Sequence, residues 1–324
     1  MLFVSFVAKH SRNSQGMKAL VYKSTGSWYT VKDETGNWHN ARIKGVFKID
    51  SITSTNPVAV GDEVDIEVED EGENTAMITS IHARRNYINR QSPRFKHQHH
   101  IVASNLDQSL LVATIKEPRT SQGFIDRFLV ASEMFHVKAL IVFNKSDLFK
   151  KKDQEKYAAM KQMYQDVGYS VFLTSTINET GIEELKQELK GKTTLVSGHS
   201  GVGKSSLLNM IFPNMNLKTG EISGWSGKGQ HTTTFAEMFD LPFGGRIIDT
   251  PGMREFGLVD ISKPEVSHYF PEMRERLNDC QFNNCMHVNE PGCAIKQAVA
   301  DGEIHEDRYV SYVNIMESIE EKSY

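Results

Sequence analysis

One stretch of the sequence decides the fold: Gly198-His199-Ser200-Gly201-Val202-Gly203-Lys204-Ser205. It matches the phosphate-binding loop pattern G-x-x-x-x-G-K-[ST] at every fixed position. A short β-type run, Thr193 to Ser197, precedes the loop, and a helical run, Ser205 to Ile211, follows it. In such a loop the backbone N–H groups point at phosphates and the following helix contributes its positive end. The stretch therefore predicts a nucleotide-binding α/β domain.

A second motif predicts which base is bound. Asn144-Lys145-Ser146-Asp147 ends the apolar strand expected at Ala139 to Phe143. The carboxylate of Asp147 can accept hydrogen bonds from the N1–H and 2-amino groups of guanine, a pair of donors that adenine lacks. Thr174-Ser175-Thr176 ends the next strand and resembles the turn that supports guanine, so Ser175 joins the predicted site. These motifs predict GTP as the ligand and disfavour a P-loop kinase.

The order of the motifs is unusual. The base-reading motif lies upstream of the phosphate loop, whereas in an ordinary GTPase it lies downstream, and Asp249-Thr250-Pro251-Gly252 follows both. This order indicates a circularly permuted G domain, expected over residues 106–261. Strands and helices alternate there, which predicts a mainly parallel sheet covered on both faces, with ligands at the carboxyl ends of the strands.

The expected chemistry assigns a role to each polar group around the triphosphate. Lys204 bridges the β- and γ-phosphates, and Ser205, Thr233 and Asp249 hold Mg²⁺, although any threonine of 232–234 could be the ligand. The Gly252 N–H senses the γ-phosphate. The predicted GTP-binding residues are Asn144, Lys145, Ser146, Asp147, Ser175, Gly198, His199, Ser200, Gly201, Val202, Gly203, Lys204, Ser205, Ser206 and Gly252.

The residue that positions the attacking water is not the usual one. Ras-type GTPases have a glutamine directly after the Asp-x-x-Gly motif, and this chain has Met253, whose thioether cannot hold water in the same way. The nearest alternative is His231, beside the presumed Mg²⁺ threonines. We hypothesise that hydrolysis is slow unaided and that a partner orders His231 over the γ-phosphate. The alternative is that His231 only packs or caps the loop.

All three cysteines lie near the C-terminal end, in the pattern Cys280-x₄-Cys285-x-His287-x₅-Cys293. Three thiolates and one imidazole form a closed tetrahedral set for a structural Zn²⁺. An odd number of clustered cysteines argues against a disulfide framework and for metal in a reducing compartment. We expect a zinc-binding module with helices over residues 262–324; free buried thiols are the alternative.

The N-terminal part is expected to be all-β. Residues 17–83 contain five short strands split by turns, typical of an OB-type barrel, although an SH3-like barrel has nearly the same signature. Residues 1–16 are expected to be a loose extension, and residues 84–105 a basic linker. No acidic residue occurs from Asn74 to Leu106, so this linker is the predicted RNA contact, with a solvated charged surface as the alternative. The candidate RNA-binding residues are Arg84, Arg85, Arg90, Arg94 and Lys96.

Length and composition set limits on these predictions. A chain of 324 residues suits two or three domains, and a net charge of −4 excludes a globally basic nucleic-acid-binding surface. No apolar run approaches the ~18 residues of a membrane span. We therefore expect a cytoplasmic monomer.

The order of these features resembles the RsgA (YjeQ/YloQ) family of bacterial ribosome-biogenesis GTPases. The resemblance covers about residues 17–320 and includes Ser24-Thr25-Gly26-Ser27-Trp28-Tyr29 and Glu290-Pro291-Gly292-Cys293. It implies an OB barrel, a permuted G domain and a zinc module that act on the small ribosomal subunit and its rRNA. It implies GTP hydrolysis coupled to late subunit maturation, and it also points to His231. The alternative is a GTP-sensing RNA-binding scaffold whose hydrolysis is incidental.

Overall fold

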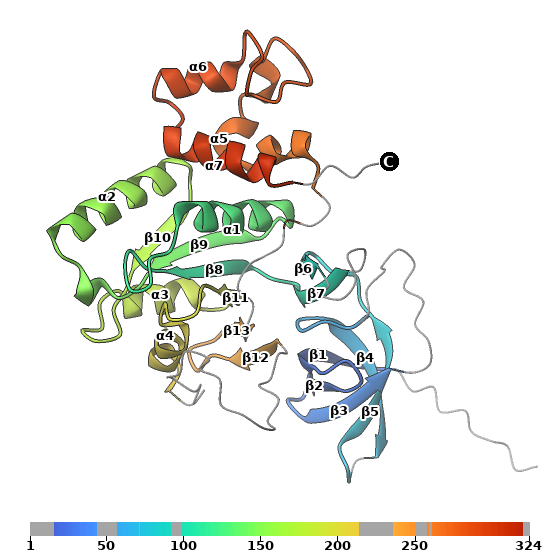
Figure 1. Ribbon diagram of the computed structural model, residues 1–324. Coiled ribbons are helices and arrows are strands. Elements are labelled where there is room, and N and C mark those ends of the chain that lie inside the picture. Colours follow the sequence, from blue (N-terminus) through green and yellow to red (C-terminus); the bar gives the residue numbers. More distant parts are fainter. Residues whose placement is uncertain are drawn as a thin grey trace, which may run out of the picture.

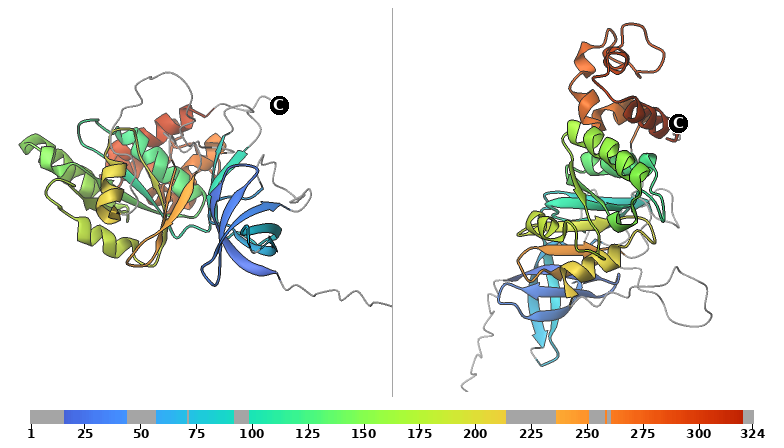
Figure 2. Two further views of the ribbon diagram at one scale, coloured as in Figure 1. Left: turned by 90° about the horizontal axis from the view of Figure 1, so that it is seen from below. Right: turned by 90° about the vertical axis from the view of Figure 1, so that its left-hand side faces the viewer.

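The computed structural model describes residues 16–43, 57–70, 72–91, 99–213, 236–250, 258 and 261–319. These residues form three bodies in a column: an N-terminal barrel, a central α/β domain and a C-terminal helical module (Figures 1 and 2). The central domain therefore touches both of the others.

The barrel has the five strands that the sequence predicts. They are β1 (Met17–Ser24), β2 (Tyr29–Asp33), β3 (Trp38–Ile43), β4 (Glu63–Asp70) and β5 (Thr75–Ile81). Their order is β1-β2-β3-β5-β4, and an additional β1–β4 pairing closes the barrel. The β3–β5 pair is parallel, whereas the other pairs are antiparallel. This closed Greek-key order confirms the OB-type prediction over the SH3-like alternative.

The central sheet is parallel apart from one strand, as predicted. Its order is β10-β9-β8-β11-β13-β12, and only β12 runs antiparallel to its neighbour β13. The strands are β8 (Gln108–Ala113), β9 (Lys138–Phe143), β10 (Ser170–Leu173), β11 (Thr193–Ser197), β12 (Glu237–Asp240) and β13 (Arg246–Asp249). Strands β8 and β11 are buried along their whole length and β9 at all but its first residue, because both faces of the sheet are covered.

Two pairs of helices cover this sheet. Helices α1 (Gln122–Met134) and α2 (Lys151–Asp166) lie on one face, and α3 (Ile182–Leu189) and α4 (Lys204–Ile211) lie on the other (Figure 1). Each pair packs into its own hydrophobic cluster with the side chains of one face of the strands. The two-layered core confirms the predicted P-loop architecture.

The barrel and the central domain share a continuous sheet, which the sequence analysis did not predict. Strand β1 pairs with β12 at Lys23 and Glu237, giving an eleven-stranded sheet. Lys23 Nζ lies 3.0 Å from the carboxylate of Glu237. Asp240 accepts hydrogen bonds from Tyr22 Oη at 2.6 Å and Lys32 Nζ at 2.7 Å. The barrel therefore contacts the strand that lies in sequence between His231 and Gly252.

The predicted basic linker contains regular structure. Strands β6 (Tyr87–Gln91) and β7 (His99–Ser104) form an antiparallel two-stranded sheet. The buried carboxylate of Asp62 fixes the end of this sheet that lies next to the barrel. Asp62 accepts hydrogen bonds from Arg84 at 2.7 Å and from Ser104 Oγ at 2.6 Å. The sequence analysis did not predict these two strands, because the contacts that fix them come from residues far apart in the sequence.

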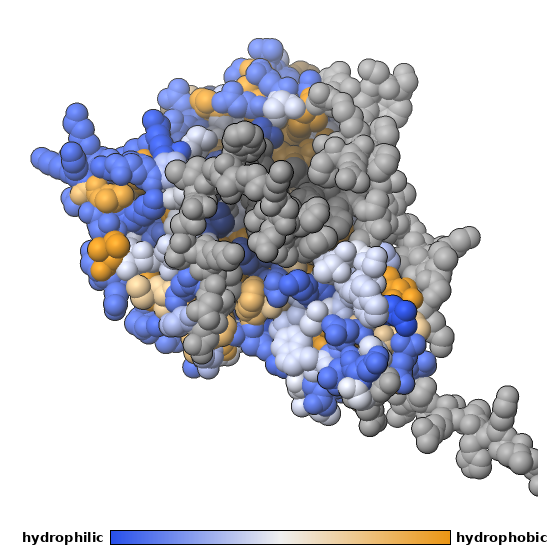
Figure 3. Space-filling model, turned by 60° about the horizontal axis from the view of Figure 1, so that its bottom comes forward, coloured by the Kyte–Doolittle hydropathy of each residue, from blue (hydrophilic) through white to orange (hydrophobic). Residues whose placement is uncertain are grey.

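The C-terminal module is helical and packs on α1. Its elements are the 3₁₀ helices Lys263–Tyr269 and Leu277–Asp279 and helices α5 (Pro271–Arg274), α6 (Ala294–Ala300) and α7 (Glu306–Glu317). Its apolar core includes Val130 of α1, so the module is continuous with the central domain. In the part of the chain that the structure describes, no helix is long and apolar enough to cross a membrane. Among the coloured residues in Figure 3 most are hydrophilic, and the apolar ones form small separate patches.

Candidate nucleotide site and metal centre

The phosphate loop lies between β11 and α4, and two of its glycines meet close neighbours. Gly198 has φ +146°, and a Cβ there would lie 2.3 Å from the carbonyl oxygen of Val112. Gly203 has φ +90°, and a Cβ there would lie 2.6 Å from Asn144 Nδ2. A side chain at either position would displace a backbone strand or the base-reading asparagine, so the loop requires glycine there.

Lys204 lies beneath the loop. Its Nζ donates hydrogen bonds to the carbonyl oxygens of Gly198 at 2.6 Å and His199 at 2.9 Å. Burial lowers the pKa of Lys204 and raises the pKa of Asp249. The charge of each residue opposes the shift of the other, but burial has the larger effect. Each group is therefore short of compensating charge, as expected of residues placed to face a triphosphate and a divalent cation.

The base-reading motif is connected to the loop by direct hydrogen bonds. Asn144 donates from Nδ2 to the carbonyl oxygen of Val202 at 3.0 Å and accepts at Oδ1 from Thr174 Oγ1 at 3.0 Å. Ser175 Oγ donates to Asp147 Oδ1 at 2.5 Å, which orients this carboxylate. The structure thus brings together three stretches of sequence that the prediction placed in one pocket.

Lys145 completes this side of the pocket. It has a left-handed backbone, with φ +64°, and its Nζ donates to the carbonyl oxygen of Glu117 at 2.6 Å. Ser146 opens the short 3₁₀ helix that carries Asp147, and Ser205 and Ser206 lie in the first turn of α4. His231, Thr233, Gly252 and Met253 lie outside the described residues.

The cysteine–histidine group has the geometry of a tetrahedral metal site. The ligand atoms of Cys280, Cys285, His287 and Cys293 all lie within 4.8 Å of one another. His287 Nδ1 lies 3.6 Å from Cys280 Sγ and 3.4 Å from Cys293 Sγ. Metal–ligand bonds of about 2.0–2.3 Å would place tetrahedral ligand atoms roughly 3.3–3.8 Å apart. The donor set and its spacing therefore fit zinc.

The protonation of two residues in this group depends on whether a cation is bound. Burial and the neighbouring thiols Cys293 and Cys280 raise the pKa of Cys285 to about 12, and burial lowers the pKa of His287. Without a positive ion Cys285 thus favours its thiol form and His287 its neutral form, and a bound Zn²⁺ would reverse the preference of Cys285.

Surrounding residues hold these ligands in place. The hydroxyl of Tyr309 donates to the carbonyl oxygen of His287 at 2.7 Å, and Tyr312 donates to that of Met286 at 2.8 Å. Glu290 accepts from the backbone N–H groups of Met286 and Val288 at 2.9 and 3.0 Å. These backbone donors lower the pKa of Glu290 even though burial opposes them.

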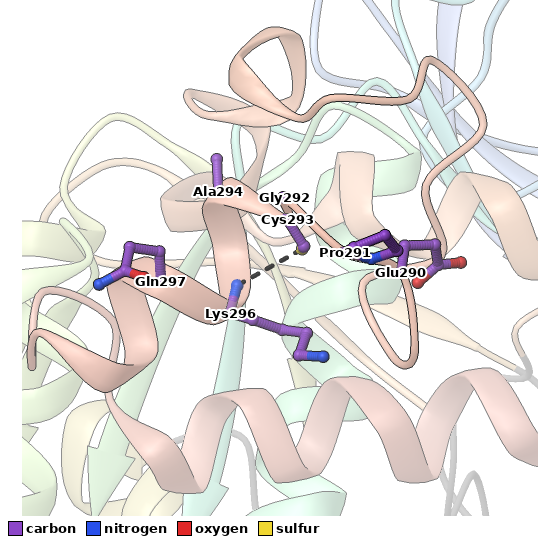
Figure 4. Close-up of a pocket in the computed structure, with 7 residues that line it drawn as sticks. All are labelled: Glu290, Pro291, Gly292, Cys293, Ala294, Lys296 and Gln297. Carbon is purple, nitrogen blue, oxygen red and sulfur yellow. Dashed lines mark hydrogen bonds between the residues drawn. The ribbon is translucent and has the colours of Figure 1, made fainter.

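A cavity lies beside the ligand Cys293 (Figure 4). Its lining residues are Glu290, Pro291, Gly292, Cys293, Ala294, Lys296 and Gln297. The backbone N–H of Lys296 donates to Cys293 Sγ at 3.5 Å, which helps to fix the position of this sulfur.

The basic RNA candidates differ in their availability. Arg84 has an 8% exposed side chain, which donates to both carboxylate oxygens of Asp62 and to the carbonyl oxygen of Pro57. It therefore stabilises the base of the β6–β7 sheet and is not presented to a phosphate. Arg85 has a 63% exposed side chain and lies 3.1 Å from Asp107. The side chain of Arg90 is not described, and Arg94 and Lys96 lie outside the described residues.

Sequence analysis missed a buried ion cluster between the C-terminal module and α1. Arg308 of α7 has a fully buried side chain and donates to Asp126 of α1 at 2.6 Å and to Glu272 at 2.7 Å. Burial would lower the pKa of Arg308, but the two carboxylates outweigh it and raise the pKa. Arg308 is four residues before buried Tyr312 and seven before buried Ile315, so helical spacing alone could have placed it on the buried face.

The fold and the pocket together define a circularly permuted GTPase of the P-loop class. The RsgA GTPase family model matches residues 81–259, and the RsgA N-terminal domain model matches residues 18–76. A small ribosomal subunit biogenesis GTPase RsgA of Flavobacterium psychrophilum is 49% identical over 306 residues, covering 94% of each chain. The protein of that name from Cytophaga hutchinsonii is 50% identical over 300 residues, covering 93% of this chain and 98% of its own.

Solved structures agree with these matches. The crystal structure of YjeQ from Thermotoga maritima has a TM-score of 0.76 at 35% identity and covers 93% of this chain and 97% of its own. The structure of YloQ, described as a circularly permuted GTPase, has a TM-score of 0.73 at 30% identity and covers 98% of this chain and all of its own. The chain belongs to the RsgA GTPase family, as its motif order predicted.

Proposed function

We propose that this protein is a GTPase that acts in the biogenesis of the small ribosomal subunit and couples GTP hydrolysis to a late step of its maturation. The proposal depends mainly on one observation: the predicted base-reading motif and the phosphate loop lie in direct contact. Asn144 of the motif donates to the carbonyl oxygen of Val202 in the loop at 3.0 Å. The small ribosomal subunit is proposed as the partner because relatives that match nearly the whole chain are named for its biogenesis.

Each group in the pocket has a proposed role. Asp147 and Ser175 read guanine, the backbone of residues 198–206 binds the phosphates, and Lys204 binds the β- and γ-phosphates. Ser205, Thr233 and Asp249 would hold Mg²⁺, and the Gly252 N–H would meet the γ-phosphate. When bound, Mg²⁺ neutralises charge that develops on the phosphate oxygens.

His231 is the proposed water-positioning residue. Replacing His231 by alanine is expected to reduce small-subunit-stimulated GTP turnover by about 100-fold, because positioned acid–base groups contribute about 10²–10⁴. GTP affinity should stay near the wild-type value, since this side chain is not proposed to bind the ground state. Turnover measured with and without purified small subunits checks both points. Unchanged stimulated turnover would remove His231 from the mechanism, and absence of stimulation in the wild type would favour the scaffold alternative.

The cysteine–histidine group is proposed to hold one structural zinc ion. Purified protein is expected to contain about one zinc per chain, and Cys285→Ser is expected to lose it, because the closed site needs all four ligands. His268→Ala is a matched control, since this histidine is close to His287 but outside the ligand set. Metal analysis by mass spectrometry checks the prediction; zinc-free wild-type protein would contradict it.

The remaining assignments complete the proposal. The domains are an extension at 1–16, an OB barrel at 17–83, a basic segment at 84–105, the permuted G domain at 106–261 and the zinc module at 262–324. The basic segment, through Arg85, Arg90, Arg94 and Lys96, contacts rRNA phosphates. The protein acts as a cytoplasmic monomer apart from its ribosomal partner.

A further inference from the structure

His199 occupies a variable position of the phosphate loop, yet its ring has a defined neighbour. The imidazole stacks on the ring of Phe124, with the ring centroids 3.7 Å apart and the planes inclined by 29°. Phe124 lies in the first turn of α1, where its backbone N–H donates to Ser121 Oγ, the cap of that helix, at 3.3 Å. The phosphate loop is therefore attached to the start of α1 by an aromatic contact.

The backbone of His199 also holds the phosphate-binding lysine. Its carbonyl oxygen accepts from Lys204 Nζ at 2.9 Å, next to the bond from the same Nζ to Gly198 at 2.6 Å. Rotation of residue 199 would move one of the two acceptors that fix Lys204. A side chain clamped against Phe124 restricts that rotation, because stacked rings have a preferred separation and orientation.

Helix α1 continues from this contact to the zinc module. Two residues after Phe124, the fully buried side chain of Asp126 accepts from Arg308 Nη1 at 2.6 Å and from Tyr164 Oη at 3.0 Å. Arg308 in turn contacts Glu272 at 2.7 Å. A rigid helix thus has the zinc module fixed to its second turn and the phosphate loop fixed to its first.

We propose that His199 is a positioning residue for Lys204, and that α1 mechanically couples this lysine to the zinc module. The inference rests on the proposed role of Lys204 as a β- and γ-phosphate ligand. Contact of a partner with the zinc module then changes phosphate binding through Arg308, Asp126 and the His199–Phe124 stack. Proximity alone does not establish such coupling. It requires that substitutions at the two contacts have non-additive effects on the free energy of nucleotide binding.

The first test substitutes the ring of His199 and compares nucleotides that carry different numbers of phosphates. His199→Ala is expected to weaken binding of GDP and of a non-hydrolysable GTP analogue by roughly three- to tenfold, the range of an aromatic pair. His199→Phe keeps a flat ring and should restore affinity to within about twofold. His199→Leu supplies apolar volume without a flat ring and should resemble alanine.

Guanosine monophosphate is the matched ligand control, because it lacks the phosphates that Lys204 reaches. Its affinity, measured by competition, should be the same in wild type and His199→Ala. An equal loss for all three nucleotides, or no loss for GDP, would overturn the positioning role. Lys204→Ala tests the underlying function separately: unchanged GTP-analogue affinity there would refute the role of the lysine itself.

The second test is a double-mutant cycle between His199, which contacts the first turn of α1, and Asp126 in its second turn. Asp126→Asn removes the charge that binds Arg308 and keeps an acceptor oxygen; circular dichroism and zinc content establish that the variant is folded. We expect Asp126→Asn to weaken GDP binding about threefold in the wild type and to have no added effect in His199→Ala. Val31→Ala, a core substitution in the separate hydrophobic cluster of the barrel, should add independently in the two backgrounds. Independent, additive effects of Asp126→Asn and His199→Ala would overturn the coupling.

Discussion

Replacing Arg308 by methionine is expected to lower the free energy of unfolding by about 3–5 kcal/mol. The carboxyl groups of Asp126 and Glu272 would be left in a buried place without the guanidinium that they contact, since the side chain of Asp126 is fully buried and that of Glu272 is 10% exposed. The substitution also removes a guanidinium that lies 4.6 Å from the ring centroid of Phe270. Chemical denaturation followed by circular dichroism measures the change.

The chain offers a matched control for this prediction. Arg274 also joins the C-terminal module to α1, through Glu133 at 3.1 Å, but its side chain is half exposed. Arg274→Met should therefore cost at most about 1 kcal/mol, as exposed ion pairs do. If the two variants lost similar amounts of unfolding free energy, burial would not be the reason for the effect of Arg308→Met.

A triple variant separates charge from packing. Asp126→Leu, Glu272→Met and Arg308→Met together remove every charge of the cluster and keep much of its volume. Apolar replacement of a whole buried ion cluster is often neutral or stabilising, so this variant should recover most of the stability lost in Arg308→Met alone. Failure to recover would assign the loss to packing around the guanidinium.

The parts of the fold that the sequence predicted are those fixed by local chemistry. The phosphate loop needs glycine at Gly198 and Gly203 because its backbone approaches Val112 and Asn144 closely, and this requirement appears directly as a motif. The base-reading motif and the cysteine–histidine group were predicted for the same reason, since each requires particular residue types at short spacing.

The missed features depend on partners distant in the sequence. The β6–β7 sheet lies in the stretch that was expected to be a basic linker. Its base depends on Asp62 of the barrel, which forms an ion pair with Arg84. The pairing of β1 with β12 joins Lys23 to Glu237, more than two hundred residues apart. No periodicity or composition within either segment indicates such a pair, so only the folded arrangement reveals it.

Replacing Asp147 by asparagine is expected to lower GTP affinity by at least about 100-fold. The asparagine amide has one acceptor oxygen and one NH₂ donor, so it cannot accept from both the N1–H and the 2-amino group of guanine. The two hydrogen bonds to a charged acceptor would be lost. The Ser175 hydroxyl, which donates to Asp147 Oδ1 at 2.5 Å, would hold the asparagine oxygen in the same orientation. Calorimetric titration with GTP and ATP measures the change in preference.

Xanthosine triphosphate distinguishes this loss of recognition from a damaged pocket. Xanthine carries an oxygen where guanine carries its 2-amino group, so the amide of asparagine can donate where the aspartate accepted. The variant should therefore bind xanthosine triphosphate more tightly than GTP, while wild type shows the opposite order. Because the phosphate loop and Lys204 are proposed to bind the phosphates of both nucleotides alike, loss of both ligands would indicate a misfolded pocket. A variant that keeps its preference for GTP would show instead that Asp147 does not read the base.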